Sequence, residues 1–363
     1  MHIAIDARII NSSTGRYVER LLHYLQQVDT TNTYSVLVRA KDEHFWQPTA
    51  ANFTVIVAEF DNYSFAEQLG FKKLLNKLKP DLVHFCMPQQ PILYKGKTIT
   101  TFHDLTLVRT YNSDKNWLVF HLKQLVGNYV FKKVAKTSDA IITPSQYTKN
   151  ELVTFTSISE DKVSVIYEAG ETGIGSNRTY QLPYKHYILY VGQQSDYKNI
   201  KRLGDAHQLL LEAFPDLGLV LVGKKNISAL KNEEYFINKQ YKNILFTDFV
   251  EDDQLNWLYA HADAYIFPSL MEGFGLPGLE AMAHGTPVVS SNATCLPEIY
   301  GDAAKYFDPT NINEIARSIT TILSDEKLRT QLSTAGYQQI KKYSWKKMAQ
   351  ETHEIYQKFL EEN

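Results

Sequence analysis

The sequence predicts an α/β protein made of two doubly wound domains. Short apolar runs alternate with helical patterns along the whole 363-residue chain, as in parallel sheets covered by helices on both faces. The length suits two domains of about 150 residues or more each. Hydrophobic residues make up 44% of the chain and charged residues 21%, which excludes a disordered or collagen-like protein.

The first half of the chain predicts strands and helices in alternation. The predicted strands are mostly apolar runs at residues 3–7, 34–39, 54–58, 82–85, 98–102, 140–143 and 163–167. Helices are expected at 64–79, 115–136 and 146–155, and a further helix follows the turn at Gly15. That helix carries apolar residues at helical spacing: Val18, Leu21, Leu22, Leu25 and Val28.

The second half repeats this arrangement. Strands are expected at 187–191, 219–222, 244–249, 264–267 and 287–290, and helices at 200–214, 252–262, 277–284, 314–323, 326–342 and 345–360. A glycine- and proline-containing polar segment, 170–186, separates the halves, which places the domains at 1–183 and 184–344. The last helix has an apolar stripe of Trp345, Met348, Tyr356 and Leu360. This stripe either docks across the domain seam or caps the second domain.

Composition excludes several classes of function. The net charge of −2 gives no basis for nucleic-acid binding. Two distant cysteines, Cys86 and Cys295, exclude a disulfide framework or a four-thiolate zinc site, and they favour a reducing, cytoplasmic location. The N-terminus lacks a signal-peptide layout, and no run of 18 apolar residues predicts a membrane-spanning helix.

The segment from residue 267 to 289 carries the most chemical information. An apolar strand runs into the glycine-rich loop EGFGLPGLE, and Pro277 stands where a helix begins. Gly273 and Gly275 let the backbone approach a ligand, and the first helical amides form an anion site suited to phosphate. Glu272 and Glu280 can accept hydrogen bonds from the hydroxyls of a sugar. The alternative is that the glycines make a turn and both glutamates are solvated.

This segment resembles the E-x7-E signature of the retaining glycosyltransferases of family 4, which have the GT-B fold. The stretches IDAR, HD, PSQYTKNEL, YVG…KN and YSW follow in the same order as in the family. The resemblance implies two facing Rossmann-like domains with a cleft between them. Residues 1–183 would bind the acceptor together with a C-terminal helix, 345–363, that crosses back to them, and 184–344 would bind the nucleotide-sugar donor.

The resemblance also implies roles for the residues of the glycine-rich loop. Glu280 would bind the ribose hydroxyls of a nucleoside diphosphate sugar, and Glu272 would hold the transferred sugar and act as a catalytic residue. The backbone around the loop would support the sugar and the diphosphate, at Gly273, Phe274, Gly275 and Leu276.

Further donor residues lie elsewhere in the chain. Lys198 matches the family lysine that neutralises the diphosphate, while Gln193 and Tyr197 stand where an arginine is common in relatives. Arg202, four residues after Lys198, would share its helical face and supply the second positive charge. Val250 falls in the turn that resembles the lining of the base pocket.

Two residues of the first domain complete the implied site. His103, at the end of a strand and followed by Asp104, matches the family histidine near the reacting carbon; a core or surface histidine is the alternative. Gly15 is the single glycine of the loop after the first strand, and its amide can meet a phosphate or the acceptor.

The implied reaction is a retaining transfer of a sugar from a nucleoside diphosphate to a hydroxyl of a glycan or lipid-linked acceptor. GDP-mannose is favoured over a UDP-sugar, because the layout resembles the mannosyltransferase branch. No Asp-x-Asp motif stands at a strand end, and Asp252 and Asp253 are better explained as helix capping, so no metal or other cofactor is expected. A catalytically silent nucleotide-sugar binding protein and a GT-B epimerase remain as alternatives.

A basic amphipathic pattern in the first domain suggests a peripheral membrane contact at the inner face of the plasma membrane. Its apolar residues are Trp117, Leu118, Phe120, Leu122, Leu125 and Val126, and its basic residues are Lys123, Lys132, Lys133 and Lys136. A packed helix with a solvated basic face explains the pattern equally well.

Overall fold

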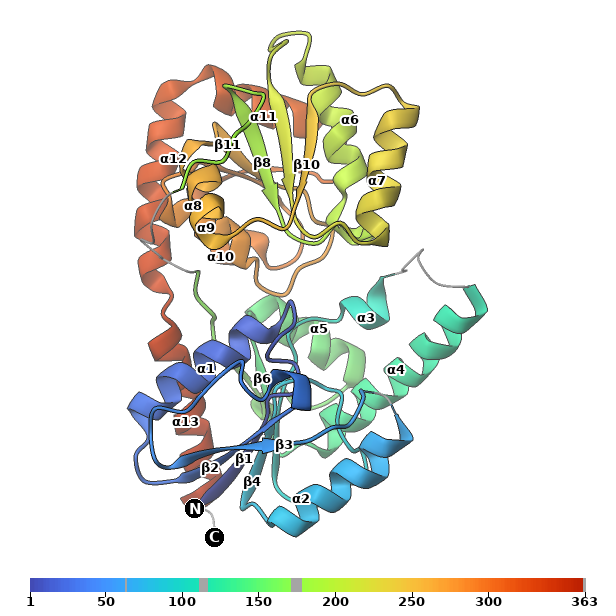
Figure 1. Cartoon of the computed structure of the whole chain (residues 1–363), viewed down its shortest axis with the longest axis vertical. Helices are drawn as coiled ribbons and strands as arrows, with labels where there is room; N and C mark the ends of the chain where they lie inside the picture. Colours follow the sequence, from blue (N-terminus) through green and yellow to red (C-terminus); the bar gives the residue numbers. More distant parts are fainter. Residues whose placement is uncertain (63, 111–116, 171–177, 362–363) are drawn as a thin grey trace. The chain divides into compact units, whose positions relative to one another are not determined.

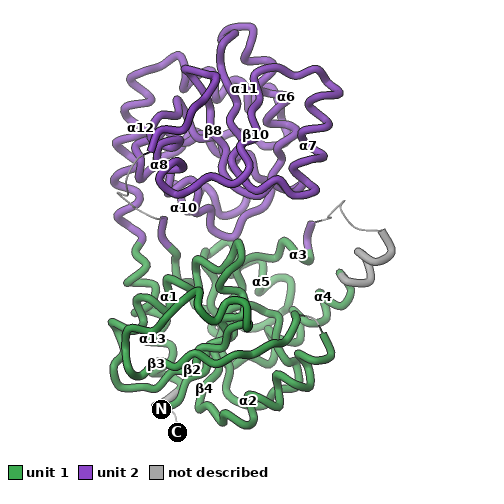
Figure 2. Tube along the Cα trace, viewed as in Figure 1, with its two compact units in different colours: residues 1–108, 122–168, 344–363 green, residues 109–121, 169–343 purple. Residues whose placement is uncertain are grey.

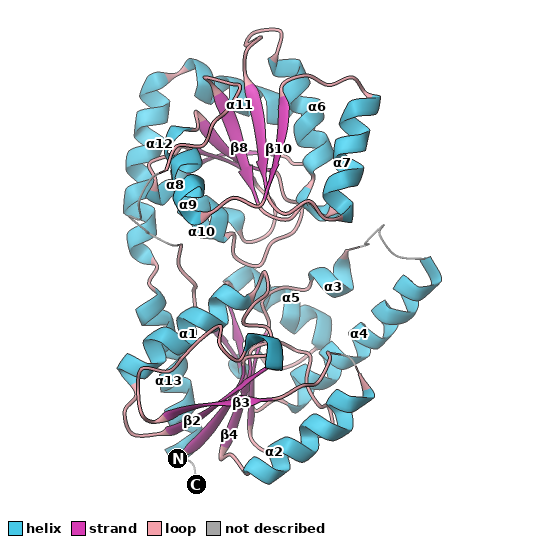
Figure 3. Cartoon of the chain, viewed as in Figure 1, coloured by secondary structure: helices cyan, strands magenta, loops and turns pink. Residues whose placement is uncertain are grey.

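The computed structural model describes residues 1–62, 64–110, 117–170 and 178–361, including their side chains except at 117–123 and 360–361. The chain divides into two compact units (Figure 2). Unit 1 comprises Met1–Val108, Leu122–Glu168 and Ser344–Asn363, and unit 2 comprises Arg109–His121 and Ala169–Tyr343. In each unit a parallel sheet carries helices on both faces (Figure 3).

Unit 1 is built on a seven-stranded sheet of order β3-β2-β1-β4-β5-β6-β7, in which all neighbouring strands are parallel. The strands are β1 (His2–Asp6), β2 (Thr33–Val38), β3 (Phe53–Val57), β4 (Leu82–Phe85), β5 (Thr98–Thr101), β6 (Ala140–Thr143) and β7 (Val163–Val165) (Figure 1). Every strand predicted in the first half of the chain is confirmed to within two residues.

The helices in this part of the chain include all those predicted and three short ones that the sequence did not predict. They are α1 (Gly15–Val28), η1 (Ala40–Asp42), η2 (Glu67–Phe71), α2 (Lys72–Leu78), α3 (Thr106–Arg109), α4 (Trp117–Thr137), α5 (Gln146–Thr156) and η3 (Glu160–Lys162). The helix predicted at 64–79 is divided, because η2 is a π-helical turn. This turn directs both Glu67 and Phe71 at the guanidinium of Arg8, which lies 2.9 Å from the carboxylate and 4.2 Å from the ring centre.

Two apolar clusters hold the helices of unit 1 on the sheet. Phe71 and Leu75 pack on Val83 and Phe85 in the first cluster. The second cluster joins β5 and β6 to α4 and α5, through Phe102, Phe131, Val134, Ile141 and Leu152. Among the described residues, no helix is both long enough and apolar enough to cross a membrane.

The C-terminal helix α13 (Trp345–Glu361) belongs to unit 1 and packs against α1. The hydroxyl of Tyr356 lies 2.6 Å from Nδ1 of His84, and Lys97 donates a hydrogen bond to the carbonyl of Phe359 at 2.9 Å. Trp345, Met348 and Tyr356 of the predicted stripe are buried, whereas the side chain of Leu360 is outside the described residues. The expected return of this helix to the first domain is confirmed.

Unit 2 repeats the topology of unit 1 with six parallel strands in the order β10-β9-β8-β11-β12-β13. They are β8 (Tyr187–Val191), β9 (Gly218–Val222), β10 (Ile244–Asp248), β11 (Ala264–Phe267), β12 (Val288–Ser291) and β13 (Ala304–Phe307). The sequence did not predict β13, because its two central residues are only partly buried at the sheet edge and break the apolar run.

The helices of unit 2 are η4 (Asp196–Lys198), α6 (Ile200–Leu210), α7 (Ile227–Asn238), α8 (Asp252–His261), α9 (Leu276–Ala283), α10 (Leu296–Tyr300), η5 (Gly301–Ala303), α11 (Ile312–Ser324), α12 (Glu326–Gln339) and η6 (Ile340–Lys342). The sequence did not predict α7, which begins where the side chain of Asn226 caps the amide of Ala229 at 3.0 Å. The helix predicted at 200–214 ends early at Leu210, since Pro215 disfavours helical backbone at Phe214.

Candidate functional site

The strand order of each sheet reverses next to the first strand of its unit. The reversal lies between β1 and β4 in unit 1 and between β8 and β11 in unit 2. Doubly wound sheets bind ligands beyond the carboxyl ends of their strands at such a point. The predicted site residues of unit 2 follow β8, β10 and β11, and those of unit 1 follow β1 and β5.

Lys198 and Glu272 meet at the reversal point of unit 2. Lys198 ends the turn η4 after β8, and Glu272 lies in the loop after β11, the neighbouring strand. The ammonium of Lys198 donates a hydrogen bond to Oε1 of Glu272 at 2.5 Å, and the two side chains are 15% and 12% exposed. The structure thus brings together two charges that are 74 residues apart in the sequence.

The surroundings of Lys198 keep its side chain positively charged. Burial by itself lowers the pKa of this ammonium, but the carboxylate of Glu272 and the phenols of Tyr197 and Tyr190 raise it by more. The pKa of Lys198 therefore lies above its ordinary value. A fixed positive charge at this point can stabilise a phosphate group.

The glycine-rich loop requires glycine at position 275. Gly275 has a left-handed backbone with φ +97°, and a Cβ there would lie 2.5 Å from the hydroxyl of Tyr300. That hydroxyl donates a hydrogen bond to the carbonyl of Gly275 at 2.5 Å. The ring of Phe274 packs edge-on against Tyr343, so this side chain serves packing. Helix α9 begins directly afterwards at Leu276, which confirms the predicted helix start.

Glu280 lies one turn into α9 and is only 6% exposed. Its Oε2 accepts a hydrogen bond from the hydroxyl of Tyr259 at 3.1 Å. Tyr259 belongs to α8, so a second helix contributes to the surroundings of this carboxylate. The sequence singled out Glu280 but gave no role to Tyr259.

The expected helical pairing of Arg202 with Lys198 is wrong. Asn199 separates the two residues with a left-handed backbone, φ +63°, so Lys198 lies in η4 and Arg202 lies in α6. Asn199 holds this break by donating hydrogen bonds to the carbonyls of Pro268 and Pro309 at 3.0 and 2.7 Å. Arg202 donates instead to the side chain of Asn199 at 2.8 Å.

Val250 is buried in the turn after β10, where the sequence placed the base pocket. Its neighbour Phe249 is 76% exposed, and Asp248 has a left-handed backbone with φ +63°. The acidic pair Asp252 and Asp253 occupies the first turn of α8 and not its N-cap, which is Glu251. The expectation that the pair caps the helix is therefore corrected, although carboxylates in a first turn still favour the helix dipole.

In unit 1, His103 is held at both ring nitrogens. Nε2 donates to the carbonyl of Cys86 at 2.9 Å, because a carbonyl oxygen only accepts, and Nδ1 lies 3.3 Å from Oε1 of Glu168. The ring of Tyr17 meets it edge-on, with ring centres 4.8 Å apart. These contacts fix the ring beyond the carboxyl end of β5. The contact with Glu168 is an ion pair when the imidazole is protonated.

Gly15 begins α1 and has a steric reason to be glycine. A Cβ at this position would lie 1.9 Å from the carbonyl oxygen of Ile10. The loop after β1 therefore folds tightly onto the start of α1. Among the described residues, no group of three or more His, Cys, Asp and Glu side chains is placed to hold a metal ion.

Comparison with known proteins identifies the family. Residues 14–169 match the model described as Glycosyltransferase Family 4, and residues 181–339 match the model described as Glycosyl transferases group 1. The O-antigen chain mannosyltransferase B of Escherichia coli is 30% identical over 274 residues, which are 72% of this chain and 70% of that protein. The chain belongs to glycosyltransferase family 4.

A second relative is similar in sequence, and two solved structures share the fold. The serotype-specific mannosyltransferase WbdA of Escherichia coli is 32% identical over 69% of this chain, although the match spans only 32% of WbdA. Sucrose-phosphate synthase from Thermosynechococcus elongatus has a TM-score of 0.81 at 17% identity and covers 100% of both chains. HepE of Anabaena, solved with UDP and glucose, has a TM-score of 0.71 at 15% identity, over 98% of this chain and 99% of HepE. The predicted GT-B fold is confirmed.

No role was assigned from the sequence to four residues that contact the predicted site residues of this glycosyltransferase. Tyr259 and Tyr300 bond Glu280 and the glycine-rich loop, and Tyr17 and Glu168 surround His103. The tyrosines are buried and fit ordinary core patterns in the sequence. Only their long-range contacts connect them to the site.

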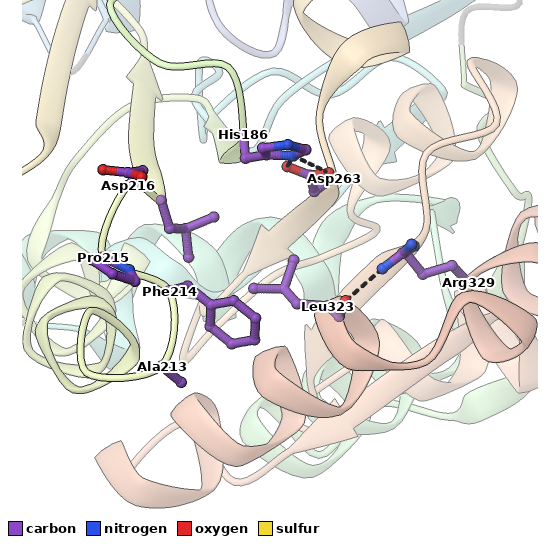
Figure 4. A pocket seen from close by; sticks show the side chains of 9 residues that line it. His186, Ala213, Phe214, Pro215, Asp216, Asp263, Leu323 and Arg329 are labelled. Atoms are coloured by element: carbon purple, nitrogen blue, oxygen red, sulfur yellow. Dashed lines mark hydrogen bonds and ion pairs between the residues drawn. The ribbon is translucent and has the colours of Figure 1, made fainter.

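A pocket of about 410 Å³ lies in unit 2 at the amino ends of β8, β9 and β11 (Figure 4). His186 lies 3.3 Å from the carboxylate of Asp263, and Arg329 donates to the carbonyl of Leu323 at 2.6 Å. Three of its titratable side chains, those of His186, Asp263 and Arg329, thus bond one another or the backbone. Its position at the amino ends of the strands separates it from the predicted donor residues.

Proposed function

We propose that this enzyme is a retaining glycosyltransferase that moves mannose from GDP-mannose to a hydroxyl of a glycan or lipid-linked acceptor without a metal ion. The observation that carries the proposal is the pairing of Lys198 with Glu272 at the reversal point of unit 2. The mannosyltransferase activity in the names of two relatives supports the choice of sugar.

Unit 2 would bind the donor through groups on three loops. Lys198 would neutralise the diphosphate, Glu272 would accept hydrogen bonds from the mannose hydroxyls, and Glu280 would accept them from the ribose. Gly273, Phe274, Gly275 and Leu276 would supply backbone groups to the sugar and diphosphate. The turn at Val250 would line the base pocket.

Lys198 and Glu272 would act together when the sugar leaves the diphosphate. The transition state develops positive charge on the sugar and negative charge on the leaving phosphate. A lysine has three N–H donors, so Lys198 can bond a phosphate oxygen while it holds Glu272. Attack from the same face would preserve the configuration of the sugar, and the leaving phosphate would take the acceptor proton. Arg202 is proposed to add a second positive charge.

Unit 1 would bind the acceptor, with His103 near the reacting carbon and Gly15 offering its amide to the acceptor or a phosphate. The contacts of His103 with Cys86 and Glu168 support this role, because they hold the ring in one orientation. A fixed group is more effective than a mobile one, since no energy is spent on ordering it during the reaction.

Thermal melting with a panel of nucleotides tests the donor site directly. GDP, UDP, ADP and dTDP are each added with and without magnesium and with EDTA. GDP at 100 times its dissociation constant should stabilise the protein by about 2.7 kcal/mol without metal. The shift should be lost in Glu280→Ala and retained in Glu298→Ala, a matched variant in α10. No shift with any nucleotide would contradict the proposal.

Product analysis then separates the possible activities. Incubation with GDP-mannose should release GDP, quickly with acceptor and slowly by hydrolysis without it. Isomerised sugar nucleotide without free GDP would identify an epimerase. Binding without any turnover in the presence of a glycan acceptor panel would identify a nucleotide-sugar binding protein.

We also propose that helix α4 contacts the anionic inner face of the plasma membrane. Leu125, Tyr129, Lys132 and Lys136 follow one another at helical spacing and are all exposed, so one stripe is apolar at its start and basic at its end. Trp117, Leu118, Phe120, Leu122 and Lys123 of the predicted amphipathic pattern have side chains outside the described residues. Lys132→Gln/Lys136→Gln should reduce sedimentation with phosphatidylglycerol vesicles, but Lys73→Gln/Lys77→Gln on α2 should not. Equal sedimentation of both variants would contradict the membrane contact.

A further inference from the structure

The side chain of Tyr259, in α8, bonds the carboxylate of Glu280. Its hydroxyl donates to Oε2 at 3.1 Å, and the two residues are 1% and 6% exposed. A carboxylate accepts about four hydrogen bonds, so this bond constrains Glu280 without exhausting its acceptor capacity.

The ring of Tyr259 is itself held in place by α9. It stacks on His284, with ring centres 5.3 Å apart and planes inclined by 17°. Nδ1 of His284 lies 2.8 Å from the carbonyl of Glu280, one turn earlier in the same helix. The carbonyl of Tyr259 also accepts a hydrogen bond from the hydroxyl of Thr286, just after α9. The contacts fix the hydroxyl of Tyr259 relative to the backbone of Glu280.

We propose that Tyr259 is a positioning residue that orients the carboxylate of Glu280 for the ribose of the donor. This inference rests on the proposed function, in which Glu280 binds the ribose hydroxyls. A glutamate has three rotatable side-chain bonds, and holding one oxygen of its carboxylate selects among its rotamers before the ligand arrives. The hydroxyl of Tyr259 thus contributes to ribose recognition without touching the nucleotide.

The experiment uses nucleotides that differ at the ribose. Dissociation constants of GDP and 2′-deoxy-GDP, and of UDP and 2′-deoxy-UDP, are measured by calorimetry for the wild-type protein and for Tyr259→Phe. We expect Tyr259→Phe to weaken ribonucleotide binding about tenfold and 2′-deoxynucleotide binding much less. In turnover, KM for the donor should rise while kcat changes little, because the hydroxyl acts on binding.

Two further variants make the test specific. In Glu280→Ala, the added change Tyr259→Phe should cause no further loss, because coupled residues are not additive. Tyr187→Phe is the matched control: this buried tyrosine donates to the carbonyl of Leu258, next to Tyr259 in α8. It should leave both nucleotides unaffected, since its hydroxyl does not bond Glu280.

The possible results distinguish the role of Tyr259 from the proposed function. Equal weakening of ribo- and deoxynucleotides by Tyr259→Phe, full additivity with Glu280→Ala, or the same loss in Tyr187→Phe would overturn the role of Tyr259. Loss of ribose preference in Glu280→Ala with none in Tyr259→Phe would overturn this role and keep the proposed function. A folded wild-type protein that binds none of the nucleotides would overturn both.

Discussion

The two units share a strand order but use charge differently where that order reverses. In unit 1, Arg8 follows β1 and pairs with Asp6 at 2.8 Å and Glu67 at 2.9 Å, in a cluster whose side chains are at most 7% exposed. In unit 2, Lys198 follows β8 and pairs with Glu272 at a more exposed position. The same point of the topology thus holds a closed ionic cluster in one unit and an accessible ion pair in the other.

The difference teaches how to separate a structural charge from a chemical one. The guanidinium of Arg8 donates to Asp6, Glu67 and the carbonyl of Phe60, so its donors serve the fold. Lys198 donates to the carboxylate of Glu272, and its pKa is raised, so a charged donor stays available to a ligand. Burial alone would have assigned both pairs to the fold.

The largest expected effects come from removing each cation. Lys198→Met should leave the protein folded but lower kcat/KM by about 10²- to 10³-fold, the scale of losing one electrostatic contact to a transition state. Arg8→Met should instead lower the free energy of unfolding by about 3–5 kcal/mol, because two buried carboxylates lose their partner. Steady-state kinetics and chemical denaturation measure the two effects.

Lys225→Met is the control for this pair of variants. Lys225 also forms an ion pair in unit 2, with Glu233 at 2.9 Å. Its hydrogen bond to Asp248, close to the turn of Val250, comes from its backbone amide, which the substitution keeps. The variant should keep normal activity and lose little stability, as more exposed ion pairs usually do. If Lys198→Met unfolded the protein, or if Arg8→Met stayed folded but lost activity, the assignment of a chemical role to Lys198 and a structural role to Arg8 would be contradicted.

Glycines in the two predicted sites give the next largest effects. Gly15→Ala places a Cβ 1.9 Å from the carbonyl oxygen of Ile10. Gly275→Ala places a Cβ 2.5 Å from the hydroxyl of Tyr300, at a position whose backbone is left-handed. Each should destabilise its own unit by about 2–3 kcal/mol. Hydrogen–deuterium exchange resolved by peptide shows which unit loosens.

Gly127→Ala is the matched control for these glycine variants. Gly127 lies inside α4, and the nearest atom to its Cβ would be in Leu107 at 3.7 Å, an ordinary contact. This change should stabilise the protein by about 0.5–1 kcal/mol through helix propensity. Equal stability of Gly15→Ala and Gly127→Ala would contradict the close approach in unit 1.

The sequence predicted the strands of both sheets better than the contacts of the site. Buried parallel strands are unbroken apolar runs, so their position is local information, and only the edge strand β13 lacked it. The glycine-rich loop and Lys198 were also recognisable, because their residue types and spacing carry the chemistry. The prediction that Arg202 shares a helical face with Lys198 was wrong, because the left-handed turn at Asn199 depends on two carbonyls that are distant in the sequence.

The partners of the predicted residues could not be read from the sequence. Lys198 and Glu272 are 74 residues apart, His103 and Glu168 are 65 apart, and no periodic pattern connects them. Each contact depends on which strands are neighbours in a sheet. The sequence therefore specified candidate chemical groups, and the topology determined which groups meet.

Substitution of His103 should have a smaller effect, and it tests whether unit 1 contributes to turnover while unit 2 binds the donor. His103→Ala should lower kcat about 50-fold, or roughly 2.3 kcal/mol, and leave the dissociation constant of GDP unchanged, because the histidine belongs to unit 1. The exposed histidine of α1, His23→Ala, is the control and should retain full activity. A His103→Ala variant that turns over normally, or that fails to bind GDP, would contradict the proposed division.

The smallest effect concerns one buried histidine in each unit. Burial, and to a smaller extent the neighbouring His103, together lower the pKa of His84 to about 3 in unit 1, and burial lowers the pKa of His207 to about 4 in unit 2. Both pKa values lie below the ordinary value of about 6.5, so the unfolded chain binds more protons as the pH falls. Stability should therefore be highest above pH 6.5 and decrease progressively towards pH 3–4.

At pH 5 each histidine should lower the free energy of unfolding of its unit by about 2 kcal/mol relative to neutral pH. Protonation of His207 also breaks a specific bond, because its Nε2 donates to the carbonyl of Leu217 and its Nδ1 accepts from Gln208. His84→Gln should flatten the pH dependence of exchange in unit 1 only, and His207→Gln should do so in unit 2 only. If either variant changed the pH dependence of the other unit, the two units would not unfold independently, and the comparison between them would have to be made on the whole chain.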